Sequence, residues 1–233
     1  MAGIGTLNEA PLHAALKDWY RRDGDLVEAP VDGLVADLLR GRTLIEIQTA
    51  GFSALRAKLD RLLDAHPIRL VHPVAARKWI VRLDGRGAPT SRRRSPKRGI
   101  PADVCAELVA FPSLLSHPNF TLEVSLVEEE ELWRPDAGRG RRRGGHVVAE
   151  RRLLGVVEAV ELASPADLWG LMPPGLPDPF TTADLARALG RSRHLAQEVG
   201  YCLRVSGACA TDGRDRRGVL YRRPGGPATG PPR

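Results

Sequence analysis

The stretch LVADLLRGRTLIEIQT, residues 34–49, decides how this chain is expected to fold. Two apolar runs, each interrupted by one acidic residue, flank the turn Arg40-Gly41-Arg42, and this pattern predicts a β-hairpin of residues 33–39 and 43–49. With the turn centred between residues 41 and 42, residues whose numbers sum to 83 face each other, which sets Asp37 opposite Glu46. Because side chains alternate between the faces of a strand, Gln48 shares the face of Glu46. The hairpin therefore predicts that Asp37, Glu46 and Gln48 converge.

The two carboxylates of this hairpin suggest a divalent cation. Neighbouring carboxylates repel each other unless a cation neutralises them, and oxygen ligands of this kind suit Mg²⁺ or Mn²⁺. The flanking residues are otherwise apolar, which favours burial of the pair. Two alternatives stay open. The hairpin could be half-exposed, with Asp37 and Glu46 facing water, or Asp32, which the register sets opposite residue 51, could be a lower-ranked acid in place of Asp37.

The order of elements around the hairpin resembles the core of the PD-(D/E)XK nuclease superfamily. Apolar periodicity predicts a helix over residues 9–20, a strand over 26–31, the hairpin, a helix over 54–65 and further strands up to residue 83. Asp37 matches the hairpin aspartate of that superfamily, Glu46-Ile47-Gln48 matches its (Asp/Glu)-x-Lys element, and Glu9 matches its additional acidic position. The resemblance implies an α/β (α+β) fold with a restriction-endonuclease-like mixed sheet flanked by helices. It also implies Mg²⁺- or Mn²⁺-dependent hydrolysis of DNA by Asp37, Glu46, Gln48 and Glu9, with Asp37 and Glu46 as the metal ligands.

Gln48 departs from that pattern, because it stands where the superfamily usually carries a lysine. An amide has no positive charge and transfers no proton, although it can orient a water molecule, so catalysis would depend more strongly on the metal ion. Lys58, on the next predicted helix, is one candidate for the missing lysine. His13 and Lys17 follow Glu9 on one stripe of the first helix. We interpret this stripe as a solvated polar face, with roles near the metal or the phosphate as the alternative.

The formal charge of +7 is distributed in alternating blocks, which indicates that some surfaces meet a polyanion. Residues 84–100, 137–152 and 181–233 carry net charges of +5, +5 and +6, whereas residues 101–136 carry −7. Two basic loops are expected to grip the DNA backbone, through Arg92, Arg93, Arg94, Arg141, Arg142 and Arg143; solvated loops without a ligand are the alternative. The run Glu128–Glu131 is expected to be a solvated strand end, on a strand that begins at residue 120 and pairs with residues 146–162.

Residues 164–223 combine short helices with a hairpin. Capping residues and apolar spacing predict helices that start at Ser164, span residues 181–190 and span 191–205, followed by two short strands around a basic tip. This order resembles a winged helix-turn-helix domain, whose second helix enters the major groove of duplex DNA while its wing contacts phosphates. The resemblance implies DNA contacts from the helix by Arg191, Arg193, His194 and Gln197, and from the wing by Arg214, Arg216 and Arg217. A protein-interaction module is the alternative.

Composition excludes several classes of protein. Of 233 residues 42% are hydrophobic, yet no window approaches the roughly 18 apolar residues of a membrane helix, and three cysteines fit neither a disulfide framework nor a zinc site. The first residues lack the basic and apolar regions of a secretion signal, so we expect a cytoplasmic protein. The expected segments are a nuclease-like core at residues 1–83, a basic loop or linker at 84–100, a helix and β-hairpin extension at 101–163, the winged helix at 164–223 and a disordered tail at 224–233.

Three functions stay open on the sequence. The first is a metal-dependent nuclease that holds DNA with its winged helix, and the second is a DNA-binding or regulatory protein with a degenerate nuclease core. The third is a protein-interaction scaffold. Gln48 favours the second of these. Duplex DNA is the expected partner, no membrane is expected, and the oligomeric state is open, with a homodimer as one option.

Overall fold

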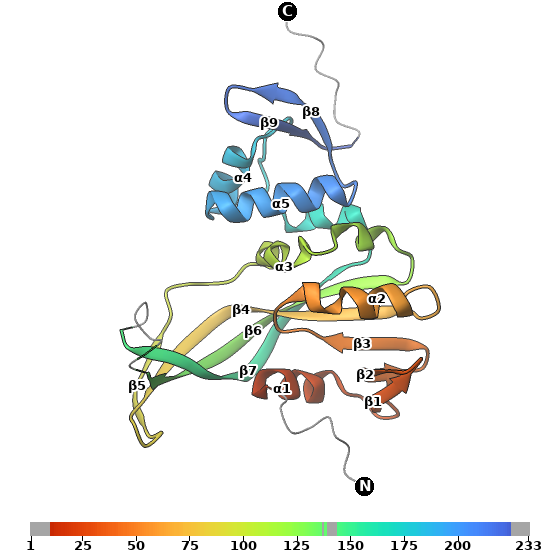
Figure 1. Ribbon diagram of the computed structural model, residues 1–233. Coiled ribbons are helices and arrows are strands. Elements are labelled where there is room, and N and C mark those ends of the chain that lie inside the picture. The colour runs from red at the N-terminus through yellow and green to blue at the C-terminus, as the bar shows by residue number, and fades with distance from the viewer. Residues whose placement is uncertain (1–9, 137, 139–143, 225–233) are drawn as a thin grey trace, which may run out of the picture. The chain divides into compact units, whose positions relative to one another are not determined.

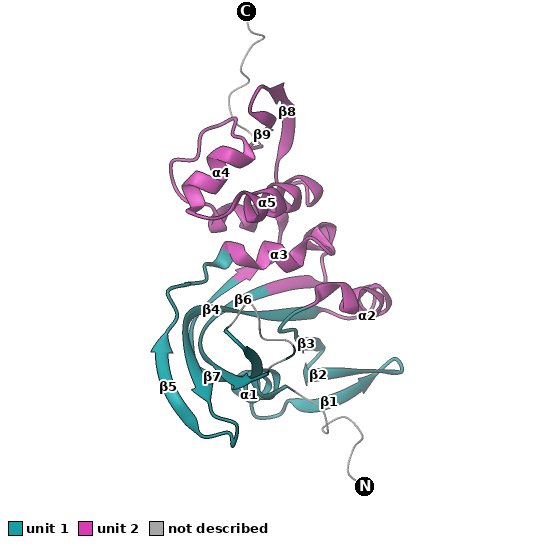
Figure 2. Cartoon of the chain, turned by 60° about the vertical axis from the view of Figure 1, so that its left-hand side comes forward, with its two compact units in different colours: residues 1–50, 68–101, 123–160 teal, residues 51–67, 102–122, 161–233 magenta. Residues whose placement is uncertain are grey.

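The computed structural model describes residues 10–136, 138 and 144–224 of the chain. The chain folds into two compact units that interleave along the sequence (Figure 2). Unit 1 contains residues up to 50 together with 68–101 and 123–160, and unit 2 contains residues 51–67, 102–122 and 161 onward. These boundaries differ from the segments expected from the sequence, because two stretches of unit 2 interrupt unit 1.

Seven strands form one mixed sheet (Figure 1). Its order is β1-β2-β3-β4-β6-β7, and β5 pairs with the second half of β4. The pairs β1–β2 and β2–β3 are antiparallel, whereas β3 and β4 run parallel. The expected α+β class is therefore confirmed. The strands are β1 Leu26–Val31, β2 Leu34–Arg40, β3 Thr43–Ile47, β4 Ile68–Leu83, β5 Pro89–Arg94, β6 Phe120–Pro135 and β7 His146–Leu162.

Two tight turns set the register of the first three strands. Asp32 and Gly33 join β1 to β2 with φ angles of 50° and 76°, the positive values that a two-residue hairpin turn requires. Gly41, with φ of 58°, begins the turn between β2 and β3. The β2–β3 register is Leu38↔Ile45, Leu39↔Leu44 and Arg40↔Thr43. The expected pairing, in which residue numbers sum to 83, is therefore confirmed.

Helix α1, Pro11–Tyr20, packs its apolar stripe on the sheet of unit 1. Leu12 and Leu16 are buried, and each contributes roughly 1.5–3 kcal/mol when it leaves water. The helix begins with Pro11, whose missing N–H costs nothing in the first turn. The cluster that forms around the helix contains Leu12, Leu16, Leu38, Ile45, Ile47, Val71 and Val127.

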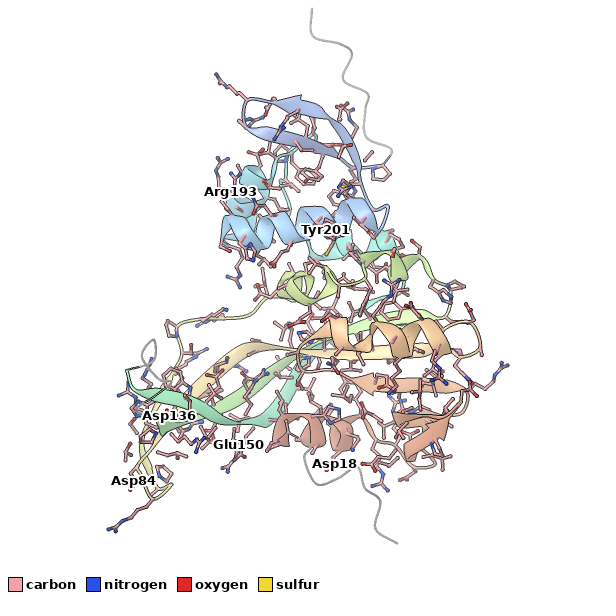
Figure 3. The ribbon with its side chains drawn as sticks, in the orientation of Figure 1. Asp18, Asp84, Asp136, Glu150, Arg193 and Tyr201 are labelled. Atoms are coloured by element: carbon pink, nitrogen blue, oxygen red, sulfur yellow. The ribbon has the colours of Figure 1, made fainter. Side chains whose placement is uncertain are left out.

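The segment expected as a basic loop or linker contains strand β5. This strand pairs antiparallel with β4, and the hairpin between them is marked in Figure 3 by Asp84 near its tip. The guanidinium carbon of Arg92 lies 5.0 Å from the centroid of the Trp79 ring, and its Nε pairs with Glu130 at 2.6 Å. Glu130 lies 38 residues after Arg92 in the sequence, so the Gly, Pro and Ser content of the segment gave no sign of this pair.

The acidic run on β6 is also paired rather than solvated. Glu129 is fully buried, and its Oε2 accepts from Arg151 of β7 at 2.7 Å while its Oε1 lies 3.1 Å from Lys78 of β4. Lys78 also pairs with Glu131. The expectation of a solvated strand end is therefore wrong, because the neighbouring strands supply cations on both sides of β6.

Unit 2 is built mainly from helices. Its core contains two aromatic groups: Phe52 stacks on Phe111 at 5.3 Å between centroids, and Phe180 stacks on Tyr221 at 5.5 Å. None of the helices in the described part of the chain is long and apolar enough to cross a membrane. The elements are η2 Phe52–Leu55, α2 Arg56–Leu62, η3 Pro101–Val104, α3 Cys105–Leu108, η4 Pro112–Ser116, η6 Pro165–Leu171, α4 Thr182–Leu189, α5 Arg193–Val205, β8 Ala210–Asp215 and β9 Gly218–Arg222.

Side-chain caps fix the ends of α4 and α5. Thr181 and Asp184 form a capping box at the start of α4, and Gly190 ends this helix with φ of 62°. The Ser192 hydroxyl accepts the Leu195 backbone N–H at the start of α5. Each such cap contributes about 1 kcal/mol. The helices expected over residues 181–190 and 191–205 are therefore confirmed, the second with its first helical residue at Arg193.

Candidate functional site

Three carboxylates occupy one cross-strand position of unit 1, which we call the acidic row: Glu28 on β1, Asp37 on β2 and Glu46 on β3. The pairs that set this position are Val27↔Leu38, Ala29↔Ala36 and Leu38↔Ile45. In the β1–β2 ladder, Glu28 and Asp37 are the one opposed pair that is not regularly paired. The β2–β3 ladder ends at Leu38↔Ile45, one residue before Asp37 and Glu46 would pair. The acidic row therefore lies where the β1–β2 ladder is interrupted for one step and where the β2–β3 ladder ends.

Asp37 is held from two sides. Its Oδ2 accepts a hydrogen bond from the Ile47 backbone N–H at 2.7 Å, and His13 Nε2 lies 3.2 Å from the same oxygen. The carboxylate thus satisfies a backbone donor that strand pairing leaves available at this step. The Asp37 side chain is 20% exposed, so solvent reaches it.

Glu46 lies deeper in the unit. Its exposed fraction is 4%, and its neighbours along β3, Ile45 and Ile47, are both buried. A carboxylate that loses its water is stabilised in the charged form only by hydrogen bonds or by a cation. The alternative of a hairpin that faces water is therefore wrong for Glu46.

Gln48 follows directly after β3 and continues its pairing with β4. The Gln48 backbone N–H donates to Val71 O at 2.9 Å, and the Nδ1–H of His72 donates to Gln48 O at 2.7 Å. The side-chain Nε2 donates to the backbone oxygen of Ala50 at 2.6 Å. The side-chain nitrogen of Gln48 therefore already donates a hydrogen bond inside the chain. The orientation of a catalytic water by this residue stays a prediction.

Helix α1 directs two basic side chains at two members of the acidic row, Asp37 and Glu28. His13 approaches Asp37, and one turn later Lys17 Nζ pairs with Glu28 Oε1 at 3.2 Å. Lys17 is 8% exposed. The interpretation of this helix stripe as a solvated face is therefore wrong, because both side chains have acidic partners on the sheet.

Glu28 is the member of the acidic row that the sequence analysis missed. Its φ is 52°, a left-handed conformation that costs a non-glycine residue roughly 1–2 kcal/mol. A glutamate in a sequence does not predict a positive φ angle. One signal was available: Glu28 stands nine residues before Asp37, as Asp37 stands nine residues before Glu46, which is the spacing of two consecutive tight hairpins.

The donor chemistry of the acidic row suits a hard cation, although the described residues hold no complete site. Among residues 10–136, 138 and 144–224, no three His, Cys, Asp or Glu side chains form a group that could hold a metal ion. Mg²⁺ uses one or two carboxylates and completes its shell with water and phosphate oxygens, so the carboxylates of Asp37 and Glu46 are chemically of the kind that it binds. Glu9, the third acidic residue that the resemblance implies, lies outside the described residues.

A second candidate site lies on unit 2, along the exposed face of α5. Arg193, His194, Gln197, Tyr201 and Arg204 are all exposed and recur at helical spacing. Figure 3 labels Arg193 and Tyr201 on this helix. The guanidinium carbon of Arg204 lies 5.6 Å from the centroid of the Tyr201 ring. Tyr201 was not among the expected contacts, although its spacing of four residues from Gln197 places it on the same face.

The hairpin β8–β9 adds cations to unit 2. Arg214, Arg216 and Arg217 are exposed around its tip, and Arg217 also pairs with Asp215 at 3.0 Å. Arg191 differs from these expected contacts, because its Nε donates to Asp103 of η3 at 3.2 Å and only 26% of its side chain is exposed. Arg191 therefore supports the packing of α5 rather than its exposed face.

The basic residues of the expected loops divide into two sets. Arg92 is engaged by Trp79 and Glu130, as described above, whereas Arg93 and Arg94 are exposed on β5. Arg141, Arg142 and Arg143 lie outside the described residues. Of the expected loop contacts in the described part of the chain, Arg93 and Arg94 are therefore the better placed for a polyanion.

The fold and its sites define an α+β protein with an acidic row in one unit and a basic helix face in the other. The chain belongs to the family described as domain of unknown function DUF8091, whose model matches residues 10–163. It is 32% identical over 232 residues to an uncharacterized protein of Treponema pallidum (strain Nichols). This alignment covers 98% of this chain and 91% of the Treponema protein. No solved structure matches the chain. The family match includes the acidic row and ends before α4 and α5.

Proposed function

We propose that this protein hydrolyses phosphodiester bonds of DNA with the help of a divalent cation bound at the acidic row. The observation that carries the proposal is the position of Asp37 and Glu46. They stand at the register step where β2 and β3 stop pairing, with His13 against Asp37. The order α1-β1-β2-β3-α2-β4, with β3 parallel to β4, also agrees with the PD-(D/E)XK arrangement that the sequence resembles.

The reaction needs a water oxygen to form a bond with phosphorus while the bond from phosphorus to the leaving oxygen breaks. The leaving oxygen takes up a proton, and the other proton of the water is released. When bound, the divalent cation supplies positive charge that lowers the pKa of water and offsets the charge on the phosphate. Asp37 and Glu46 would hold the cation, and His13 would keep the Asp37 carboxylate in place. Burial of Glu46 strengthens its attraction for the cation.

We further propose that unit 2 holds the DNA. Its helices α4 and α5 and its β8–β9 hairpin follow the order of a winged helix, and α5 exposes Arg193, His194 and Gln197. A helix of this kind fits the major groove, whereas arginines of a hairpin tip fit phosphates. Residues 181–233 contain ten cations and four anions, which favours a nucleic acid over a neutral partner.

Cleavage of supercoiled plasmid with Mg²⁺ or Mn²⁺ tests the hydrolytic proposal. The wild-type protein is expected to nick the plasmid, and Glu46→Gln is expected to abolish nicking while it leaves DNA binding intact in a mobility-shift assay. The matched control is Glu158→Gln, because Glu158 is an exposed glutamate of β7. If the wild-type protein leaves the plasmid uncut with every divalent cation, the hydrolytic proposal is wrong.

A second candidate function is DNA binding without hydrolysis, and Gln48 favours it. This residue lacks the charge of a lysine, and its amide nitrogen already donates to Ala50 O at 2.6 Å. Binding of a labelled duplex by a protein that does not cut would support this function. In that case Arg193→Ala is expected to weaken binding, whereas the matched control Arg56→Ala, which removes an exposed arginine of α2, is expected to leave it unchanged.

A further inference from the structure

Strand β7 ends the strand order of the sheet in unit 1, and among the described residues it pairs with β6 on one side only (Figure 1). A strand in this position presents a row of backbone N–H and C=O groups that can pair with a strand of another chain. Strand β7 is long, since it spans His146–Leu162. The open side of this strand along residues 146–160 is therefore a candidate docking surface, which we call the β7 edge.

The other two edge strands carry features that hinder pairing with a further strand. Strand β1 has six residues, and it contains Pro30, which lacks a backbone N–H, and Glu28, whose φ of 52° interrupts the ladder. Strand β5 begins with Pro89 and ends in three consecutive arginines. In contrast, residues 146–160 contain no proline and no positive φ angle. The β7 edge therefore keeps its backbone donors and its extended course.

The middle of the β7 edge is apolar although it is exposed. The Leu154 side chain is 47% exposed and the Val157 side chain is 52% exposed. Their neighbours Leu153 and Val156 pack on the core of unit 1 but are only partly buried. Apolar side chains gain free energy when they leave water. A partner that covers residues 153–157 would therefore be stabilised by this apolar stretch.

The charges that flank the apolar stretch favour a second copy of the chain as that partner. Arg152 precedes the stretch and Glu158 follows it, each three residues from Gly155. Arg152 also pairs with Glu150 at 2.5 Å, yet 54% of its side chain is exposed. When two copies pair antiparallel about Gly155, Arg152 of each copy lies opposite Glu158 of the other. The same register sets Leu154 of each copy opposite an apolar residue, so the edge is complementary to itself.

Nothing within one copy requires glycine at position 155. A Cβ atom on Gly155 would meet no atom within 4 Å, and the residue has no positive φ. Glycine weakens the interior of a strand, and it often marks a place where another backbone approaches closely. An axis between two copies at Gly155 sets the two glycines opposite each other. The position of this glycine therefore agrees with the register that the flanking charges favour.

We propose that the protein forms a homodimer in which the β7 edges of two copies pair antiparallel about Gly155. A two-fold axis relates the copies, so each contributes the same surface. Backbone hydrogen bonds join the strands, and two ion pairs between Arg152 and Glu158 fix the register. The sheet of unit 1 then continues from one copy into the other. This inference goes beyond the proposed function and does not depend on it, because the β7 edge and the acidic row belong to opposite ends of the strand order.

Sedimentation velocity of the full chain over a range of concentrations tests the dimer. The wild type is expected to sediment with twice the mass of one chain. Arg152→Glu and Glu158→Arg each set like charges against each other at both ion pairs. Each substitution is expected to raise the Kd of the dimer roughly tenfold. Arg93→Glu, which reverses an exposed arginine of the edge strand β5, is the matched control and is expected to dimerise like the wild type.

An equal mixture of the two variants separates strand pairing from a folding defect. In a mixed dimer, one chain carries Arg152→Glu and the other carries Glu158→Arg, so both pairs again join opposite charges. The mixture is therefore expected to dimerise at concentrations where neither variant does so alone. A wild type that is monomeric throughout the micromolar range overturns the proposal. It is also overturned if either variant keeps the wild-type Kd or if the mixture stays monomeric. None of these outcomes bears on plasmid cleavage, which tests the hydrolytic site.

Discussion

At the scale of single residues, Glu28 combines a strained backbone with a contact to the buried Lys17. A φ of 52° suits glycine and disfavours every side chain with a Cβ. Both Glu28→Gly and Glu28→Ala remove the carboxylate, but only glycine relieves the backbone. We therefore expect the Glu28→Gly protein to be more stable than the Glu28→Ala protein, with a free energy of unfolding about 1 kcal/mol higher. Urea denaturation measures both values.

The neighbouring position provides the control for this comparison. Val27 lies in the same strand and has no positive φ, so Val27→Gly is expected to be less stable than Val27→Ala. A Glu28→Ala protein as stable as Glu28→Gly would contradict the strain that we assign to this residue.

Tyr201 gives a prediction for the other unit. It is 40% exposed on the face of α5 that also carries Gln197 and Arg204. If this face enters a groove, the ring contacts bases rather than phosphates. Tyr201→Ala is then expected to weaken binding to a preferred duplex about tenfold, with a much smaller effect on random DNA. Competitive fluorescence anisotropy measures both affinities. Tyr201→Phe keeps the ring and is expected to bind like the wild type; equal losses on both duplexes would contradict base contact.

The residues that could be predicted from the sequence depend on local signals, whereas those that could not depend on tertiary contacts. The register of Asp37 and Glu46 follows from one turn and from strand alternation, both of which are local. Glu28 and Lys17 depend on how α1 lies against β1, a tertiary arrangement that the local pattern does not encode. A charged side chain on a helix is predicted to be exposed to solvent unless its partner is known. For this reason the stripe of α1 that carries Lys17 was predicted to be a solvated face.

At the scale of elements, the capping box of α4 provides a prediction with a pH dependence. Asp184 Oδ2 accepts from the Thr181 hydroxyl and backbone N–H at 2.7 and 2.9 Å. These hydrogen bonds, together with nearby Arg217 and Arg187, hold the pKa of the Asp184 carboxyl below its ordinary value of 3.8. Asp184→Asn is expected to lower the free energy of unfolding by about 1 kcal/mol at neutral pH.

The direction of the pH effect follows from the lowered pKa. The charged Asp184 stabilises the folded state in full above the pKa of the unfolded chain, and this contribution is lost as the pH falls through the lower folded pKa. The difference between wild type and Asp184→Asn is therefore expected to shrink below about pH 4, in urea denaturation followed by circular dichroism. Asp60→Asn, in an exposed pair of α2, is the control with little effect at either pH. A difference that stays constant into acid would contradict the role of the charge.

Helix caps were predictable from sequence, whereas the partners of long strands were not. Thr181, Asp184 and Gly190 lie within ten residues of one another, so their pattern is visible in the chain itself. Glu129 meets Lys78 and Arg151 only after three strands have paired. Charged runs on central strands are therefore poor indicators of solvent exposure when the adjoining strands carry the opposite charge.

At the scale of the whole molecule, the α+β class followed from the sequence but the two units did not. The class depends on periodicity and on turn residues, which are local signals. The units depend on stretches 51–67 and 102–122, which belong to unit 2 although they lie between segments of unit 1. Linker composition marks boundaries only when the chain completes one unit before it begins the next, and this chain does not.

The distribution of exposed arginines over both units leads to a prediction about salt. Each phosphate that an arginine neutralises adds close to one unit to the slope of log affinity against log salt concentration. Arg214 and Arg216 are exposed at the tip of β8–β9, and Arg93 and Arg94 are exposed on β5. The double variant Arg214→Ala/Arg216→Ala is expected to reduce the slope by about two. A similar reduction in Arg93→Ala/Arg94→Ala would place the duplex on β5 as well, whereas an unchanged slope would limit contact to unit 2. Arg56→Ala is expected to leave the slope unchanged, and a slope near zero for the wild type would contradict nucleic-acid binding by either unit.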